Sequence, residues 1–223
     1  MSINDSKTAV RNPRRAPELT RQEILDAATA EFADRGPMAA RIDVIASKTN
    51  TSKRMIYYYF NSKAGLYTEV LKRAYVQIRR REIDLHPEDL EPEAALRILT
   101  RETLHHFERN SDSVRIIAYE NLQCRGTTIS GSPEFLTINE KTITILENIL
   151  ERGRASGVFR DDPRAPSAID VHQVLSAMAL NRIEHRDSFM ILFGRDMLGT
   201  EESVHIRQII EDSVLRLVLK EPK

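Results

Sequence analysis

The chain has 223 residues, of which 41% are hydrophobic, and its 33 Lys and Arg side chains balance 33 Asp and Glu side chains. This length and composition exclude collagen-like, purely coiled-coil and disordered chains, and the single cysteine excludes a disulfide scaffold or a cysteine-based zinc module. Because no apolar run approaches the roughly 18 residues that span a membrane, and residues 1–20 lack an apolar signal segment, we expect a soluble, cytoplasmic protein.

The charge is distributed unevenly along the chain. Residues 1–63 contain 11 basic and 7 acidic side chains, a net charge of +4, whereas residues 64–223 carry a net charge of −4. A basic first quarter is expected when one end of a protein meets a polyanion such as DNA. Chance is the alternative, because an excess of four charges in 63 residues is modest.

The first quarter of the chain has the pattern of a flexible arm followed by three short helices. Residues 1–19 combine basic side chains with two prolines, and we expect a flexible basic arm there. Thr20 and Glu23 form a capping-box pattern for a first helix, which ends at Gly36-Pro37. Apolar-periodic segments follow at 42–48 and 52–59, separated by a turn in which Asn50 can take the left-handed conformation. This arrangement predicts a helix-turn-helix domain over residues 20–66.

The third helix of this domain has two different faces. Ser52 is its expected N-cap, and the free backbone N–H groups behind such a cap can face a phosphate. The outer face presents side chains that suit a major groove: Lys53, Arg54, Tyr57, Tyr58 and Tyr59. An ordinary solvated face is the alternative. The inner face is expected to complete a core of Ile24, Ala28, Phe32, Ile42, Ile45, Ala46, Ile56 and Phe60.

The rest of the chain is also helical in period. The pattern predicts a long helix from Ser62 toward Ile83 and then helices at residues 93–107, 111–124, 133–155, 165–181, 187–197 and 201–219. Because no alternating apolar pattern with hairpin signals occurs, we predict an all-α fold. Residues 67–223 are enough for a second, larger helical domain with its own core.

The string Ile-Tyr-Tyr-Tyr-Phe-Asn-Ser-Lys at residues 56–63 gives an aliphatic residue, Tyr, a variable pair, Phe, a Ser-containing turn and Lys. Together with residues 36–46, it closely resembles the DNA-binding domain of TetR/AcrR-type transcriptional regulators, over Glu23 to Leu71. The resemblance implies that Tyr57 and Lys63 hold phosphates while Lys53, Arg54 and Tyr58 lie at the groove. It also implies that Tyr57 is the more buried tyrosine.

Three positions depart from the family pattern. Arg41 stands where the family often has a capping Thr or Ser, so we expect a lost cap and an additional cation facing the DNA backbone. Asn50 replaces a common turn glycine, and Tyr59 stands where His is frequent.

The resemblance implies that the larger domain forms a small-molecule cavity and a homodimer through its last two long helices. Wide apolar stripes on these helices make the candidate interface Val171, Leu175, Met178, Ile206, Ile210, Val214 and Leu217. Cavity candidates, chosen as apolar walls with a few polar groups, are Phe107, Tyr119, Leu122, Gln123, Cys124, Ile138, Thr142, Leu175 and Met178. Internal core packing is the alternative for both sets.

Together with the family resemblance, the sequence predicts a ligand-responsive transcriptional regulator. We expect a repressor, and an activator is the open alternative. We expect it to bind double-stranded DNA at a palindromic operator as a homodimer and to be released by a small-molecule effector. A helical enzyme or a structural adaptor without DNA binding is the alternative. We expect no enzymatic activity, cofactor or metal, because the histidines lack paired ligand spacing and no phosphate loop or nucleophile elbow occurs.

Overall fold

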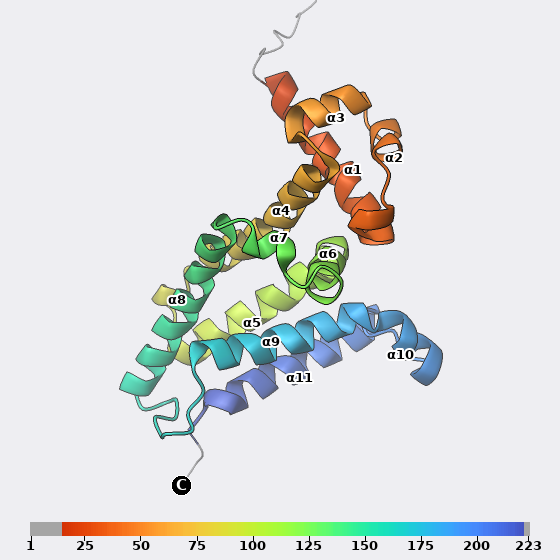
Figure 1. Ribbon diagram of the computed structural model, residues 1–223. Coiled ribbons are helices and arrows are strands. Elements are labelled where there is room, and N and C mark those ends of the chain that lie inside the picture. Colours follow the sequence, from red (N-terminus) through yellow and green to blue (C-terminus); the bar gives the residue numbers. More distant parts are fainter. Residues whose placement is uncertain (1–14, 221–223) are drawn as a thin grey trace, which may run out of the picture. The chain divides into compact units, whose positions relative to one another are not determined.

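The computed structural model describes residues 15–220, apart from the side chains of residues 15–17 and 79–83. Over this range the chain is helical, and the predicted all-α fold is confirmed (Figure 1). Its one β-type pairing among the described residues is an isolated antiparallel bridge between Phe159 and Leu219. The chain divides into two compact units, the first ending at Val70 and the second beginning at Leu71. This boundary lies within a continuous helix, four residues after the predicted one.

The first unit contains α1 (Arg15–Ala39), α2 (Ile42–Ser47), α3 (Lys53–Phe60) and the start of α4 (Lys63–Ile83). α1 begins five residues before the predicted start, so Thr20 is not its N-cap and residues 15–19 do not belong to an arm. Pro17 fits this early start, because proline is tolerated in the first turn of a helix. The remaining part of the predicted arm, residues 1–14, lies outside the described residues. Gly36 has a φ of 69° and interrupts α1 where the sequence predicted its end.

The core of the first unit is the predicted one. Ser52 is the N-cap of α3, since its Oγ accepts the Met55 N–H at 3.3 Å. The rings of Phe32 and Tyr67 meet edge to face at 5.3 Å. Ala46 is half-buried, and the other seven predicted core side chains are buried, namely Ile24, Ala28, Phe32, Ile42, Ile45, Ile56 and Phe60.

The second unit contains the remainder of α4 and the helices that follow it. These are η1 (Pro87–Asp89), α5 (Pro92–Arg109), α6 (Ser111–Leu122), α7 (Thr127–Ser130), α8 (Glu134–Ala155), α9 (Ala168–Glu184), α10 (Arg186–Phe193) and α11 (Thr200–Val218). Each predicted helix has a counterpart, and the short η1 and α7 occupy predicted gaps. α5 packs against α8, α9 and α11, so it is the central helix of this unit.

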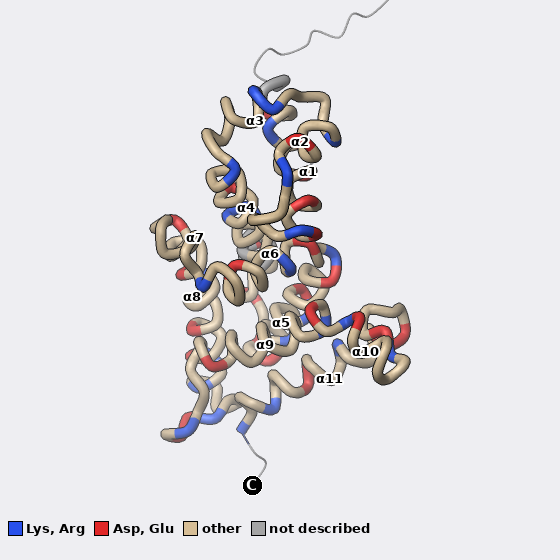
Figure 2. The backbone as a smooth tube through the Cα atoms, turned by 45° about the vertical axis from the view of Figure 1, so that its right-hand side comes forward, with Lys and Arg blue, Asp and Glu red and all other residues tan. Residues whose placement is uncertain are grey.

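Charged pairs fix the register of α5 against α11. Arg97 bonds Asp212 at 3.1 Å, and Arg101 holds the buried Glu211 through two hydrogen bonds of 3.0 and 2.8 Å. Further along α5, Glu108 binds Arg207 of α11 and the buried Arg182 of α9. As the residue numbers increase along α5, those of the partners on α11 decrease, so the two helices are antiparallel. Figure 2 shows the resulting mixture of basic and acidic segments along the helices of this unit.

Gly153 in α8 is a position where only glycine fits. A Cβ built there would lie 1.9 Å from the ring of the buried Phe159. We expect Gly153→Ala to lower the free energy of unfolding by about 1 to 3 kcal/mol through overpacking, although helix propensity alone favours alanine by about 1 kcal/mol. Urea denaturation measures the change. The control is Gly131→Ala, whose Cβ would meet nothing closer than 3.5 Å, and equal stability of the two variants would contradict the packing argument.

Candidate functional site

The outer face of α3 gathers the predicted groove residues. Lys53 and Arg54 are exposed in the first turn, and Tyr57 and Tyr58 are 46% and 75% exposed one turn later. Their spacing of i, i+1, i+4 and i+5 puts all four on one side of the helix. α3 therefore presents two cations and two phenols outward from a helix whose other side is buried in the core.

Tyr59 is the most buried of the three tyrosines, so the expectation that Tyr57 is the more buried one was wrong. The ring of Tyr59 packs edge to face against that of Tyr58, with the ring centroids 5.5 Å apart, and its centroid lies 6.2 Å from that of the Phe60 ring. These aromatic neighbours cover part of Tyr59, which is half-buried. Tyr58, by contrast, exposes the larger part of its surface. Tyr59 thus supports the exposed ring of Tyr58.

Arg41 is not the additional free cation that the sequence suggested. As expected, it gives α2 no side-chain cap. Its guanidinium instead holds both oxygens of Asp43, at 3.2 and 2.7 Å. The Arg41 hydrogen bonds are the main cause that lowers the pKa of Asp43 to about 2, so this carboxylate is ionised at neutral pH. Lys53 Nζ lies 3.9 Å from the same carboxylate.

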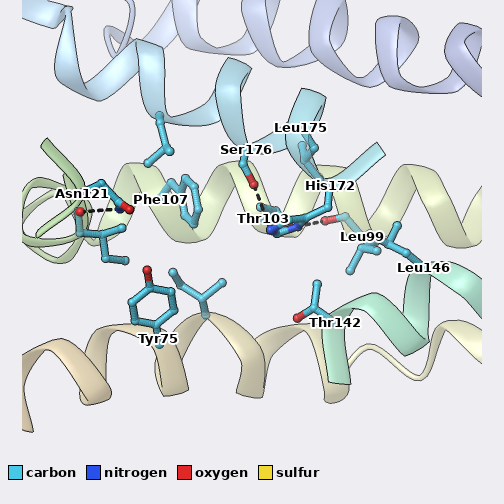
Figure 3. A pocket seen from close by; sticks show the side chains of 13 residues that line it. Tyr75, Leu99, Thr103, Phe107, Asn121, Thr142, Leu146, His172, Leu175 and Ser176 are labelled. Atoms are coloured by element: carbon cyan, nitrogen blue, oxygen red, sulfur yellow. Dashed lines mark hydrogen bonds between the residues drawn. The ribbon is translucent and has the colours of Figure 1, made fainter. Parts of the chain in front are cut away.

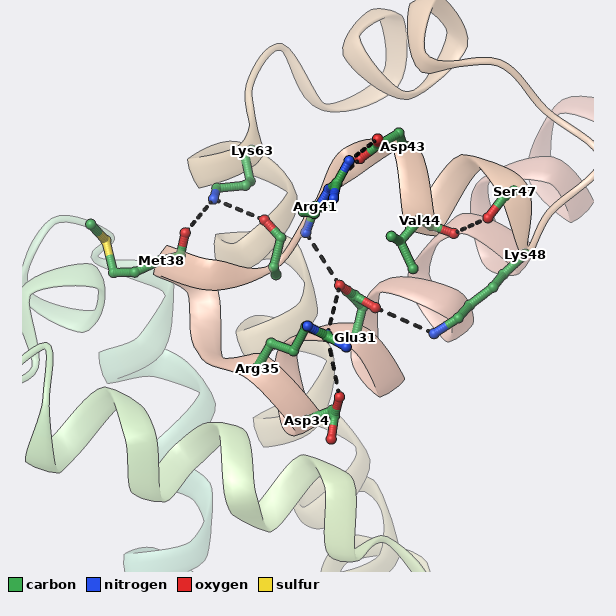
Figure 4. A network of polar contacts seen from close by, with 11 residues as sticks. Glu31, Asp34, Arg35, Met38, Arg41, Asp43, Val44, Ser47, Lys48 and Lys63 are labelled. Carbon is green, nitrogen blue, oxygen red and sulfur yellow. Dashed lines mark hydrogen bonds and ion pairs between the residues drawn. The ribbon is translucent and has the colours of Figure 1, made fainter.

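A buried carboxylate, Glu31 of α1, anchors α2 at both ends (Figure 4). Glu31 is 2% exposed. Its oxygens accept the backbone N–H of Arg41 at 3.3 Å and the ammonium of Lys48 at 3.3 Å, and Arg35 Nε lies at 3.7 Å. Sequence analysis missed this residue. The available signal was an acidic residue on the apolar face of α1, three positions after Ala28.

Lys63 has an internal role in the structure. Its Nζ donates to the backbone carbonyls of Met38 at 2.9 Å and Ala40 at 3.0 Å, as Figure 4 shows. An ammonium group has three donors, so at most one is left for a phosphate. Lys63 therefore braces the link between α1 and α2, and the phosphate contact that the resemblance implies stays a prediction.

A cavity of about 180 Å³ lies within the second unit (Figure 3). Three of the nine predicted cavity residues line it, namely Phe107, Thr142 and Leu175. The other lining residues were not predicted: Tyr75, Ile78, Leu99, Thr103, Ile117, Asn121, Leu146, His172, Ser176 and Leu180. The signal for His172 and Ser176 was their i, i+4 spacing on one face of a helix, and their side chains lie 3.5 Å apart.

Six of the nine predicted cavity residues do not line this cavity, so the predicted lining was wrong at these positions. They are Tyr119, Leu122, Gln123, Cys124, Ile138 and Met178. Leu122 is 73% exposed and Gln123 is also exposed. α6 ends at Leu122, so Gln123 and Cys124 lie beyond the helix that carries Ile117 and Asn121 to the cavity wall.

The predicted dimer interface also needs correction. Val171, Leu175, Ile210 and Val214 are buried inside the chain's own core, where they cannot face a second copy. Met178, Ile206 and Leu217 are half-buried. The large apolar side chains that α9 and α11 do expose are Ile169, Val204 and Ile209.

The described part of the chain holds neither a metal-binding cluster nor a membrane-spanning helix. No three His, Cys, Asp or Glu side chains between residues 15 and 220 come together in a way that could hold a metal ion. Within the same range, none of the helices combines the length and the apolar character needed to cross a bilayer.

Comparisons with known proteins match both units. Residues 24–70 match the family described as bacterial regulatory proteins, tetR family, and residues 92–214 match the tetracyclin repressor-like C-terminal domain. The repressor NicS of Pseudomonas putida is 35% identical over 70% of this chain and 72% of its own length. The repressor SCO4008 of Streptomyces coelicolor is 27% identical over 92% of this chain and 97% of its own. The crystal structure of SCO4942, a regulator from the same species, superposes with a TM-score of 0.63 at 25% identity, covering 89% and 98% of the two chains.

The brace formed by Lys63 predicts a loss of stability on its removal. Lys63→Met keeps the aliphatic stem but removes both carbonyl hydrogen bonds, and we expect the free energy of unfolding to fall by about 1.5 to 3 kcal/mol. Lys53→Met is the matched control, because the exposed Lys53 ammonium has, among the described residues, the Asp43 carboxylate at 3.9 Å as its partner. Its removal should cost less than about 0.5 kcal/mol. Thermal unfolding followed by circular dichroism measures both. A Lys63 variant as stable as the Lys53 variant would show that the two carbonyl hydrogen bonds of Lys63 do not stabilise the first unit.

Proposed function

Since this chain belongs to the TetR family of bacterial regulatory proteins, we propose that it represses transcription by binding a palindromic DNA operator as a homodimer, and that a small molecule in its cavity releases it. The family makes it a transcription regulator and not an enzyme. NicS and SCO4008 are both named as repressors, which favours repression over activation. Because its proposed partner is DNA, we place the protein in the cytoplasm.

The exposed face of α3 is the observation that carries this proposal. Arginine can form two hydrogen bonds with the edge of a guanine base, and lysine supplies a point charge for a phosphate. Arg54 and Lys53 lie in the first turn of α3, the part of a recognition helix that reaches base edges. Tyr57 and Tyr58 follow on the same side, where a ring can contact a thymine methyl group and a hydroxyl can reach a phosphate.

The homodimer is supported by apolar side chains that the second unit leaves exposed. Ile169 of α9 and Val204 and Ile209 of α11 are half or more exposed. On α10 the consecutive residues 190–193 are all large, apolar and exposed, and no residue of this helix is buried. Four consecutive positions span about 300° of a helix, so the chain's own surface cannot cover them all. A second copy fits, because a palindrome requires two α3 helices related by a two-fold axis.

α10 is held in a defined position for such a contact. Arg186 at its start forms two hydrogen bonds of 2.7 Å with Asp196, which follows its end. This pairing lowers the pKa of Asp196 to about 2, so both charges persist at neutral pH. This ion pair ties the start of α10 to the segment that follows its end, so both ends of the apolar helix are fixed.

Effector release is proposed to pass through α4. This helix starts at Lys63, which holds the α1 to α2 link, and carries Tyr75 and Ile78 into the cavity wall. A ligand that contacts the cavity wall differently in two positions of α4 would favour one of them. A tenfold loss of operator affinity requires about 1.4 kcal/mol of such coupling.

DNA binding is tested with a fragment from upstream of the protein's own coding region. We expect nanomolar to micromolar binding by fluorescence anisotropy, whereas a structural adaptor would give none. Arg54→Ala should weaken binding by about 1 to 3 kcal/mol and relax the preference at one base pair. Arg115→Ala, an exposed arginine of α6, is the control and should bind as the wild type does. Equal affinity of the wild type and the Arg54 variant would refute the groove assignment.

The interface is tested by two adjacent isoleucines of α11. Ile209 is 50% exposed and Ile210 is 4% exposed. We expect Ile209→Asp to give folded monomers that bind operator DNA poorly, because the added carboxylate would be buried between copies without a partner. Ile210→Asp should instead unfold the second unit, since it places the charge in the chain's own core. Sedimentation equilibrium and circular dichroism separate the two results, and an undiminished dimer of Ile209→Asp would exclude this face of α11.

A further inference from the structure

A carboxylate lies beside the first turn of α3, next to the face that is proposed to meet DNA. Asp43 is the second residue of α2, and its side chain is 37% exposed. Its Oδ2 lies 3.9 Å from the Nζ of Lys53, the first residue of α3. DNA presents phosphates to a protein face that binds it. An acidic group at this position therefore opposes the binding that its neighbours favour.

Asp43 and Arg41 form a pair without net charge. The guanidinium donates from Nε and Nη2 to the two carboxylate oxygens, at 3.2 and 2.7 Å, and Figure 4 shows the two side chains together at the start of α2. The carboxylate stays ionised at neutral pH, because these hydrogen bonds are the main cause that lowers the pKa of Asp43 to about 2. A phosphate that approaches the pair meets a cation and an anion together, so its attraction to Arg41 is largely cancelled.

Arg41 can still bind a phosphate, but only in one direction. A guanidinium has five N–H groups, and Asp43 accepts from two of them, which leaves three. Because the guanidinium is planar and the carboxylate holds it on one edge, the remaining N–H groups point in fixed directions. A phosphate that lies in those directions is bonded, whereas one that lies nearer the carboxylate is repelled.

The same carboxylate also weakens the attraction of Lys53 for phosphates. A phosphate oxygen bonded to the Lys53 ammonium at about 2.8 Å would lie within about 7 Å of the Asp43 carboxylate. This is shorter than the Debye length of about 8 Å at physiological ionic strength, so salt does not remove the repulsion. Lys53 is therefore a better partner for a phosphate on the side that faces away from Asp43.

We propose that Asp43 is a specificity-determining residue, which reduces the binding of the protein to DNA other than its operator. Binding to other DNA depends on contacts between cations and phosphates in any register, and Asp43 restricts both Arg41 and Lys53 in making them. Operator binding adds base contacts and occurs in one register, in which an arginine that is already oriented loses little conformational freedom. This inference rests on the proposed function, in which α3 reads an operator.

The test compares Asp43→Asn with the wild type on two DNA duplexes. One is the upstream fragment used above, and the other is a shuffled duplex of the same length and composition. The variant removes the negative charge and releases Arg41, with little change in side-chain size. We expect the shuffled duplex to bind at least about fivefold more tightly, and the upstream fragment less than about twofold more tightly.

The dependence on salt is the second measurement. Fluorescence anisotropy between about 50 and 200 mM salt gives the slope of log affinity against log salt concentration. For the shuffled duplex we expect this slope to become steeper by about 1 in Asp43→Asn, because one further cation pairs with a phosphate. An unchanged affinity for the shuffled duplex, or an equal gain on both duplexes, would overturn the proposal.

Asp34→Asn is the matched control. Asp34 is exposed, and the Nε of Arg35 lies 3.4 Å from its carboxylate. The variant changes the net charge by the same amount and also removes a partner of an arginine in the first unit. Figure 4, however, places Asp34 on the opposite side of Glu31 from Asp43. We expect both duplexes to bind as they bind the wild type, and a gain equal to that of Asp43→Asn would show that net charge alone is responsible.

Two further variants separate the charge from the fold. Asp43→Glu keeps the carboxylate and should keep the salt slope of the wild type, so a Glu variant with the slope of the Asn variant would contradict the role of the charge. Circular dichroism shows whether each variant is folded. Should Asp43→Asn fail to fold, Asp43→Ser removes the same charge with a smaller polar side chain, and the same results are expected.

The wild-type measurements keep this inference distinct from the proposed function. A wild type that binds the upstream fragment no better than the shuffled duplex contradicts the proposed function, and this inference fails with it. A wild type that prefers the fragment, together with an Asp43→Asn variant that keeps the full preference, contradicts this inference alone.

Discussion

The buried carboxylate of Glu31 is the constraint on which the first unit depends. α2 has six residues, far fewer than an isolated helix needs to be stable in water. Its position must therefore come from tertiary contacts, and Glu31 supplies one at each end, through the Arg41 N–H and the Lys48 ammonium. Because α2 and α3 are joined by a short turn, fixing α2 also fixes the direction in which α3 presents its outer face.

Contacts within the first unit also determine which of its cations are free to bind DNA. A net charge of +4 over residues 1–63 suggests a uniform basic surface, but Lys48, Lys63 and Arg41 are each engaged by oxygens of the chain itself. A cation held in this way has fewer donors left for a phosphate than a cation without internal partners. Arg54, on the exposed side of α3, has no such internal oxygen among the contacts of the described chain, which is why we assign it the reading role. In the second unit, charged side chains likewise pair with one another between α5, α9 and α11.

Sequence reasoning succeeded where one period determines one face. The apolar spacing of α1 to α3 gave the buried core of the first unit because a three-helix unit has only one inside. It failed where two faces of a helix are both apolar. On α11, Ile210 and Val214 face the core while Val204 and Ile209 face outward, and nothing in their chemistry distinguishes the two sets. It failed similarly for the cavity, because periodicity shows which side chains point inward but not where inward-pointing side chains leave a space. The early start of α1 was missed because Pro17 reads as a helix breaker unless it lies in a first turn.

The proposed effector and the proposed release mechanism are consistent in energy. About 12 residues separate Lys63 from Tyr75 along α4, which is roughly 18 Å of helix at 1.5 Å per residue, and both residues belong to this one helix. A tenfold change in operator affinity needs about 1.4 kcal/mol, and one hydrogen bond between neutral groups contributes about 1 kcal/mol net. One or two hydrogen bonds that a ligand makes in only one position of α4 are therefore enough. Such a switch does not require the chain to give up the ionic contacts that hold α5 to α11 and α1 to α2.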